Sequence, residues 1–371
     1  MTMIRWILKT LWLQKGSVLG SAAGVAVAFL LVIIIEAAFV GESRQIVAYI
    51  EHSKADVWVM QRGVSNMHMA TTFVWDWKLR KVRETPGVKQ ATPILYVNTA
   101  VKAGGKNWFA YVIGLMPDGQ RAGPWSMARG KAHPQAGEII LPAALANMGN
   151  IKLGDMAGIA DQQFRIVGFS NNTFSMANSV AFVTFKDLED LISSSGTVSF
   201  ILVDAEEGVD PKELARRIEA NVEKVAAIDH DRFIKNDFQI ALLMGVEIVS
   251  FMTIIGSTLA ALIIAFASWS QVARRKWELA IIKTLGFNNT ALYMAVIIQS
   301  LIITALALGL ALLLAALLVP GLSAAVPIIT LEVTSAALLR MTGIALIIAL
   351  LAALLPAWLV ARVDPASAFK V

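Results

Sequence analysis

Few residues of this chain have the types and spacings that catalysis requires. The four histidines are scattered, without an HExxH, a GxSxG or an acidic calcium-loop pattern, and the 371-residue chain has no cysteine. The glycine pair before Lys106 lacks the upstream glycine and the following Ser or Thr of a Walker phosphate loop. We therefore expect no catalytic residue, no metal centre and no nucleotide site in this chain.

One small group of side chains has the chemistry of a soft metal site. Thioethers and an imidazole suit copper, and the group consists of Met60, Met67, His68 and Met69. Packing is the favoured interpretation, because methionine commonly fills gaps in cores.

Two tryptophans raise the question of an aromatic ligand cage. Trp75 and Trp77 flank Asp76, and residues two apart point to different faces of a helix. We therefore expect ordinary burial of both rings.

The composition indicates that much of the chain lies in a membrane. The chain is 57% hydrophobic and only 16% charged, with a mean hydropathy of +0.64, which is too apolar for a wholly water-exposed protein. Four stretches meet the roughly 20 apolar residues that a bilayer requires: about 18–40, 242–269, 291–319 and 341–361. The sequence thus predicts an integral membrane protein with four transmembrane helices.

Two of these stretches contain a carboxylate near the outer end. Glu36 lies in the first and Glu247 in the second. Intramembrane carboxylates are costly and often functional, so both are candidates for lining a substrate path between the two spans. The alternative is that they reach the interface or bond a neighbouring Ser or Thr.

The distribution of charge orients the chain. Lys and Arg gather before the first span, after the second and after the fourth, as expected of cytoplasmic segments. The long insert between the first two spans has as many cations as anions. Both termini are therefore predicted to be cytoplasmic and the insert to be outside. The pI of about 9.4 comes from the membrane ends, so it does not indicate nucleic-acid binding.

The insert has the pattern of a mixed domain. Short β-branched and aromatic runs predict strands, at 56–60, 94–101, 108–115, 138–141, 164–169, 180–185 and 199–203. Helical patterns lie between them, at 76–84, 142–148, 186–193 and 211–225. An α+β extracytoplasmic domain follows, and the helical pattern from about 231 to 244 predicts a continuous stalk into the second span.

A short helix is predicted between the second and third spans, over 274–287. Leu279, Ile282 and Leu285 repeat at three-residue spacing, and Gly286 is placed as the terminator. A soluble partner can bind a cytoplasmic helix of this kind and move it. The alternative is that this Arg-rich segment only reflects the excess of positive charge in cytoplasmic loops. That explanation does not account for Glu278 or for the Leu-Gly ending.

This segment resembles the R-x-x-E-I-A-I-L-K-A-L-G signature of FtsX/MacB-type ABC transporter permeases, the type VII or mechanotransmission class. The ending from Pro356 to Phe369 is similar to the family's C-terminus, and Gly137–Pro142 with 153–155 and 164–168 is similar to its "GEVVLS … KVGD … FRVVGI" pattern. Without a fused ATPase, the chain looks like the DevC or heme-exporter branch.

The resemblance implies a permease, not an enzyme, whose ATP and Mg are bound by a separate ABC ATPase subunit. It implies a second permease copy, in a homodimer, and ATPase docking on the short helix. The positions matched for coupling are Arg275, Glu278, Lys283, Leu285, Gly286 and Phe287. Trp277 departs from the small polar or charged residue usual in the family.

Three functions fit this class. The first is export of an amphipathic or lipid-like substrate from the inner membrane, with a periplasmic adaptor and an outer-membrane channel as added partners. The others are activation of an extracytoplasmic cell-wall hydrolase and lipoprotein extraction.

The expected order of segments combines these observations. It is an interfacial amphipathic helix (1–16), span one (17–40), the α+β MacB-like periplasmic domain with its stalk (41–240), span two (241–270), the coupling helix (271–290), span three (291–319), an outer loop (320–340), span four (341–361) and a cytoplasmic tail (362–371).

Overall fold

The computed structural model describes residues 9, 12–13, 15–68, 70–117, 122–174, 179–274, 276–284, 288–326 and 329–361. The chain divides into two compact units. The helical unit comprises residues 1–40, 245–326 and 331–371, and the sheet unit comprises residues 41–244 and 327–330. Most of the predicted interfacial helix and the whole C-terminal tail lie outside the described residues.

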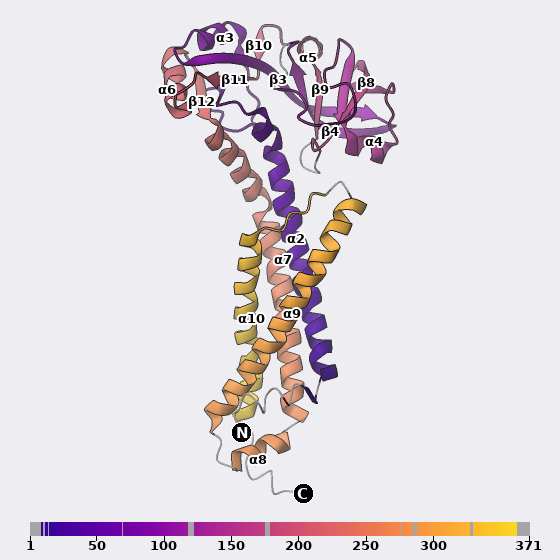
Figure 1. The fold of residues 1–371 in the computed structure, drawn as a ribbon, viewed down its shortest axis with the longest axis vertical. Helices are drawn as coiled ribbons and strands as arrows, with labels where there is room; N and C mark the ends of the chain where they lie inside the picture. Colours follow the sequence, from indigo (N-terminus) through magenta and orange to yellow (C-terminus); the bar gives the residue numbers. More distant parts are fainter. Residues whose placement is uncertain are drawn as a thin grey trace. The chain divides into compact units, whose positions relative to one another are not determined.

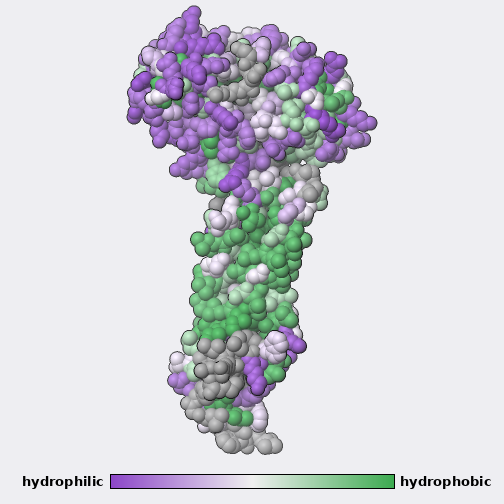
Figure 2. Space-filling model, viewed as in Figure 1, coloured by the Kyte–Doolittle hydropathy of each residue, from purple (hydrophilic) through white to green (hydrophobic). Residues whose placement is uncertain are grey.

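Four long helices build the helical unit and are apolar enough to cross a membrane. They are α2 (Lys15–Ser53), α7 (His230–Arg274), α9 (Asn289–Ala325) and α10 (Ser335–Ala361), with the short α8 (Lys276–Thr284) between α7 and α9 (Figure 1). Hydrophobic side chains cover the outside of these helices (Figure 2), including Phe251, Leu262 and Leu313. Surfaces this apolar need lipid or another apolar partner, so the four predicted membrane helices are confirmed.

The bounds of these helices differ from the sequence prediction. α2 continues beyond Val40 to Ser53, and α9 continues through Pro320 to Ala325. The stretch between α9 and α10 is therefore shorter than the predicted outer loop. α7 is one helix from His230 to Arg274, as expected for an unbroken stalk.

The helices of this unit pack through small residues. Gly256 of α7 faces Val32 of α2 so closely that a Cβ at this position would collide with the valine side chain. Between α9 and α10, the buried Ser300 hydroxyl donates to the Ala349 carbonyl oxygen at 2.8 Å. Close approach at small residues is the usual basis of helix association in membranes.

The sheet unit contains a ten-stranded sheet and a two-stranded one. The large sheet has the order β12-β1-β11-β3-β4-β9-β6-β8-β5, with β7 paired to β3 and β8, and the small sheet pairs β10 with β2. The strands are β1 (Val57–Gln61), β2 (Val74–Trp75), β3 (Val88–Ala103), β4 (Lys106–Leu115), β5 (Met127–Gly130), β6 (Glu138–Pro142), β7 (Met156–Ile159), β8 (Gln162–Ser170), β9 (Val180–Thr184), β10 (Thr197–Val198), β11 (Phe200–Ala205) and β12 (Val225–Asp229).

β3 belongs to two groups of strands. Its first half pairs antiparallel with β11, and its second half, from Leu95, pairs with β4. Four helices accompany these strands: α3 (Asp76–Arg83), α4 (Ala143–Gly149), α5 (Phe185–Leu191) and α6 (Pro211–Asn221). Figure 1 shows α6 beside β12 in one group, and α4 and α5 with β4, β8 and β9 in the other.

The predicted strands are all present, and the α+β class is confirmed. At α6, the prediction is right about the start and wrong about the end. Asp210 accepts a hydrogen bond from the Glu213 amide at 3.2 Å and Pro211 occupies the first turn, so the helix begins where the pattern placed it. The helix ends at Asn221, however, and Val225–Asp229 forms β12, because its backbone pairs with β1 along five residues.

Candidate functional site

The helix α8 is fixed to the helical unit by one face. Leu279 and Ala280 are buried in a cluster with Val272 of α7, Leu292 and Val296 of α9, and Ala353 of α10, and Ile282 packs against the same cluster. Leu279 and Ile282 are two of the three positions predicted for the apolar face. The third, Leu285, lies outside the described residues. One short helix therefore contacts three membrane helices at once.

The opposite face of α8 is open to a partner. Trp277 is 61% exposed, and Glu278 beside it is also exposed. Lys283 is half-buried, and desolvation lowers the pKa of its ammonium group. Of the other residues matched for coupling, Arg275, Gly286 and Phe287 lie outside the described residues. The structure thus presents an aromatic ring and a carboxylate together at the exposed part of this helix.

The intramembrane carboxylate Glu36 has a partner that sequence reasoning missed. Its side chain is buried on α2 and forms an ion pair with Arg340 of α10. The segment before α10 is tied to the same place, since the Glu332 amide donates to the Ala37 carbonyl oxygen at 2.9 Å. The signal was available: Arg340 is the only cation of the predicted outer loop, and a buried carboxylate requires a partner.

Glu247 has a different environment. It is exposed on α7, and within the described part of the chain no ion pair or hydrogen bond engages it. No described contact joins it to Glu36. Whether the two carboxylates line one path stays a prediction.

The predicted soft-metal group is divided by the fold. Met60 and Met67 are fully buried in an apolar cluster with Trp58 and Phe233, whereas Met69 lies outside the described residues. His68 instead contacts Asp237, with 3.1 Å between its Nδ1 and Oδ1. Among the described residues no group of three His, Cys, Asp or Glu side chains gathers. These contacts favour the packing interpretation.

Asp237 is a second residue that the sequence analysis did not single out. It lies on α7 with a fully buried side chain, and its two oxygens accept hydrogen bonds from the Met67 amide at 2.8 Å and the His68 amide at 3.2 Å. Burial raises the pKa values of Tyr96 and Tyr111 nearby, and the charge of Asp237 adds to both shifts. An acidic residue on an otherwise apolar helix face was the available signal. Asp237 attaches the first turns of α7 to the loop after β1.

The sheet unit has an open groove of about 1030 Å³ between α6, β12 and α7. Its lining mixes apolar residues with charges of both signs: the cations Lys212, Arg216, Arg232 and Lys235 and the acids Glu219, Asp229 and Asp231. A groove with this many charges does not suit a lipid-like ligand, because burying apolar groups against charges gains little.

The expected burial of Trp75 and Trp77 is wrong. Trp75 is 58% exposed and Trp77 is 43% exposed. Trp75 lies in β2 rather than in a helix, and β2 pairs only with the short β10. The ring of Trp75 therefore stays outside the main sheet and its cores.

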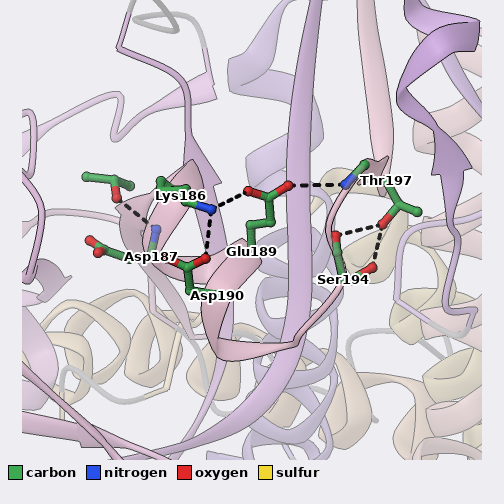
Figure 3. Close-up of polar contacts among 8 residues, drawn as sticks. Lys186, Asp187, Glu189, Asp190, Ser194 and Thr197 are labelled. Carbon is green, nitrogen blue, oxygen red and sulfur yellow. Dashed lines mark hydrogen bonds and ion pairs between the residues drawn. The ribbon is translucent and has the colours of Figure 1, made fainter.

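A polar network holds the turn before β10 (Figure 3). Lys186 bridges Glu189 and Asp190, and the Glu189 carboxylate accepts a hydrogen bond from the Gly196 amide at 3.2 Å. The Gly196 carbonyl oxygen in turn accepts from the Asp76 amide at 2.9 Å. The start of α3, with both tryptophans, is thereby anchored to α5.

Four membrane helices, an α+β unit between the first two, and a short packed helix between the second and third define a multispanning membrane subunit. Comparisons with known proteins agree with this class. Residues 18–221 match the MacB-like periplasmic core domain family, and residues 250–365 match the FtsX-like permease C-terminal family. The chain belongs to the FtsX/MacB-type ABC transporter permeases, and it is a membrane protein with an extracellular domain.

The relatives span most of the chain. An uncharacterised ABC transporter permease of Mycobacterium tuberculosis is 25% identical over 324 residues, covering 85% of this chain and 84% of its own length. The periplasmic region of MacB from Actinobacillus actinomycetemcomitans is similar over 52% of this chain and 97% of its own, with 13% identity and a TM-score of 0.37. The extracellular domain of YknZ from Gram-positive bacteria is similar over 42% and 90%, with 14% identity and a TM-score of 0.34.

Proposed function

We propose that this permease couples ATP hydrolysis by a separate ATPase subunit to movement of its extracellular domain, and so exports an amphipathic or lipid-like substrate. The proposal rests on α8, which has one buried face and one exposed face. Its buried face packs against α7, α9 and α10, and its other face exposes Trp277 and Glu278. A partner that pushes α8 would move all three helices, because packed cores transmit displacement rather than absorb it.

The continuity of α7 supports transmission to the sheet unit. α7 begins at His230, directly after β12, and ends at Arg274, before α8. Near its start, Phe233 stacks on Trp58 of β1 with 4.8 Å between ring centroids, and Asp237 accepts the two backbone hydrogen bonds of the loop after β1. A shift of α7 along or about its axis would therefore displace β1, β12 and that loop.

The amphipathic character of the proposed substrate is inferred from the location of the exposed apolar surface. The groove of the sheet unit is lined by charges, whereas α7, α9 and α10 expose many large hydrophobic residues. An amphipathic substrate would therefore engage the membrane helices, with an adaptor and a channel as outer partners. The homodimer belongs to the same proposal.

The test begins with affinity purification of the tagged full chain from its native membrane and mass spectrometry of its partners. An ABC ATPase is expected, and Trp277→Ala and Glu278→Ala should each reduce its recovery and its stimulated ATP turnover about tenfold. Phe109→Ala is a matched control, because Phe109 is 63% exposed but lies on β4 of the sheet unit.

Each other outcome has a clear meaning. Recovery of no ATPase, or equal recovery with the α8 variants and the control, would refute the coupling proposal. An ATPase accompanied by a cell-wall hydrolase would replace export with hydrolase activation.

Topology has its own test. A reporter inserted at Gly105, in an open turn between β3 and β4, should read outside, and one fused after Val371 should read cytoplasmic. The reverse pattern would overturn the orientation on which the coupling proposal rests.

A further inference from the structure

The sheet unit exposes three large aromatic side chains within five residues. Phe73 is 45% exposed, Trp75 58% and Trp77 43%. Val74, between Phe73 and Trp75, is buried, because side chains alternate along an extended segment, and Trp77 follows in the first turn of α3. Apolar groups gathered on the surface of a water-soluble unit mark interaction sites.

The backbone beneath these rings is held at several points. Thr72 accepts a hydrogen bond from the Gln61 amide at 2.9 Å, β2 pairs with β10, and the Asp76 amide donates to Gly196. The Lys186 network of Figure 3 holds Gly196 itself. The aromatic side chains therefore need little ordering when a partner binds, which favours affinity.

Cations follow the three rings in the sequence and lie beside the Trp77 ring. α3 contains Lys78, Arg80, Lys81 and Arg83 against the single acid Asp76. The ammonium groups of Lys78 and Lys81 lie 5.5 Å and 5.3 Å from the centroid of the Trp77 ring. Arg80 and Lys81 are exposed, and no described residue forms an ion pair with either.

We propose that Phe73, Trp75, Trp77, Arg80 and Lys81 form a docking surface, the aromatic-cationic surface, for an extracellular protein with an acidic contact region. Aromatic residues and arginine dominate the energetics of protein interfaces, and a cationic rim steers an acidic partner. This surface does not fit the same surface of a second copy, because the two would face each other with like charge.

A membrane is the other class of surface that aromatic and cationic residues bind. Insertion requires rings that project into the lipid. Here each ring has about half of its surface against the protein, and two ammonium groups already lie over Trp77. Rings that are half covered by the protein in this way favour a protein partner. The proposal goes beyond the proposed function and does not depend on α8 or on an ATPase.

Site-specific photocrosslinking of the full chain in its native membrane tests the surface. p-Benzoylphenylalanine is placed at Phe73, Trp75 or Trp77, and at Phe109 as the exposed aromatic control on the same unit. We expect one and the same protein adduct at the three positions and none at the control. The crosslinked peptide of the partner should be rich in Asp and Glu.

Charge reversal supplies the decisive comparison. Arg80→Glu with Lys81→Glu should lower the adduct yield about tenfold or more, whereas Arg80→Lys with Lys81→Arg should preserve it. Both residues are exposed, so the reversed chain should fold, and unchanged hydrogen exchange of β3 and β11 checks this. Adducts with lipid only, with a second copy of the chain, at no patch position, or unaffected by charge reversal would each overturn the proposal.

Discussion

The two units of the chain each bury a carboxylate on a long helix, and they satisfy it differently. In the sheet unit, Asp237 is held by two backbone amides and the His68 ring. In the helical unit, Glu36 is held by the side chain of Arg340. The difference has a physical cause. The backbone amides of membrane helices are already hydrogen-bonded within each helix, so a buried acid between helices must be paired by another side chain.

The comparison also predicts which contact can open. The Asp237 bonds come from a loop that is fixed at both ends by β1 and by Thr72. Arg340 is a long side chain with 64% of its surface exposed, so it can leave Glu36 for water or lipid headgroups. The start of α7 is thus held rigidly within the sheet unit. We expect the Glu36–Arg340 ion pair to be the contact that breaks during a conformational cycle.

The largest effect is expected from Asp237→Ala. This substitution leaves the buried amides of Met67 and His68 without an acceptor, which costs about 3–5 kcal/mol in the free energy of local opening. Hydrogen exchange of peptides covering residues 62–73 measures it. Asp237→Asn keeps one acceptor oxygen and should lose less, and the exchange of β5 is the internal control. Equal protection in all three chains would show that α7 does not hold this loop.

A smaller effect is expected from Arg340→Met, which leaves the Glu36 carboxylate unpaired among apolar side chains. Because Arg340 is partly solvated, we expect about 2–3 kcal/mol of destabilisation in detergent. The double variant Glu36→Met with Arg340→Met removes both charges and should recover most of the loss. If the double variant is as unstable as the single one, the ion pair is not the source of the effect.

Sequence reasoning succeeded where the signal is local. Unbroken apolar stretches predicted the four spans, and β-branched runs predicted β3 and β4. The helical pattern that begins at 211 predicted the start of α6. In each case the residues that determine the element lie within it or directly beside it.

The failures involve partners that are distant in the chain. Met67 and Asp237 are 170 residues apart, and nothing local indicates their hydrogen bond. Trp75 was expected to be buried, but it lies on the short β2, which pairs with β10, and its side chain stays exposed. β12 was not predicted, because its strand partner β1 is distant in the sequence. Much of the coupling segment stays untested, because Arg275 and 285–287 lie outside the described residues.

Glu138 is a third buried carboxylate, and it predicts how the stability of the sheet unit depends on pH. Its buried carboxylate accepts from the Gln135 amide at 2.9 Å and from Lys131 at 3.3 Å, and with Arg165 nearby these contacts lower its pKa. A lowered folded-state pKa stabilises the fold above the ordinary value of 4.5, and this stabilisation is lost as pH falls through the folded-state value. Glu138→Gln should therefore flatten the decline of sheet-unit stability below about pH 4.5. An unchanged pH profile would show that other carboxylates cause the decline.

The smallest effect on stability is expected from Glu247→Gln, because this exposed side chain has no described partner to lose. We expect a change within about 0.5 kcal/mol. Coupled ATP turnover of the purified complex is the informative measurement, alone and combined with Glu36→Gln. If the carboxylates line a path, turnover falls while expression and thermal stability of Glu247→Gln stay normal. Normal turnover in both variants would leave Glu36 as a structural partner of Arg340 and Glu247 without a role in transport.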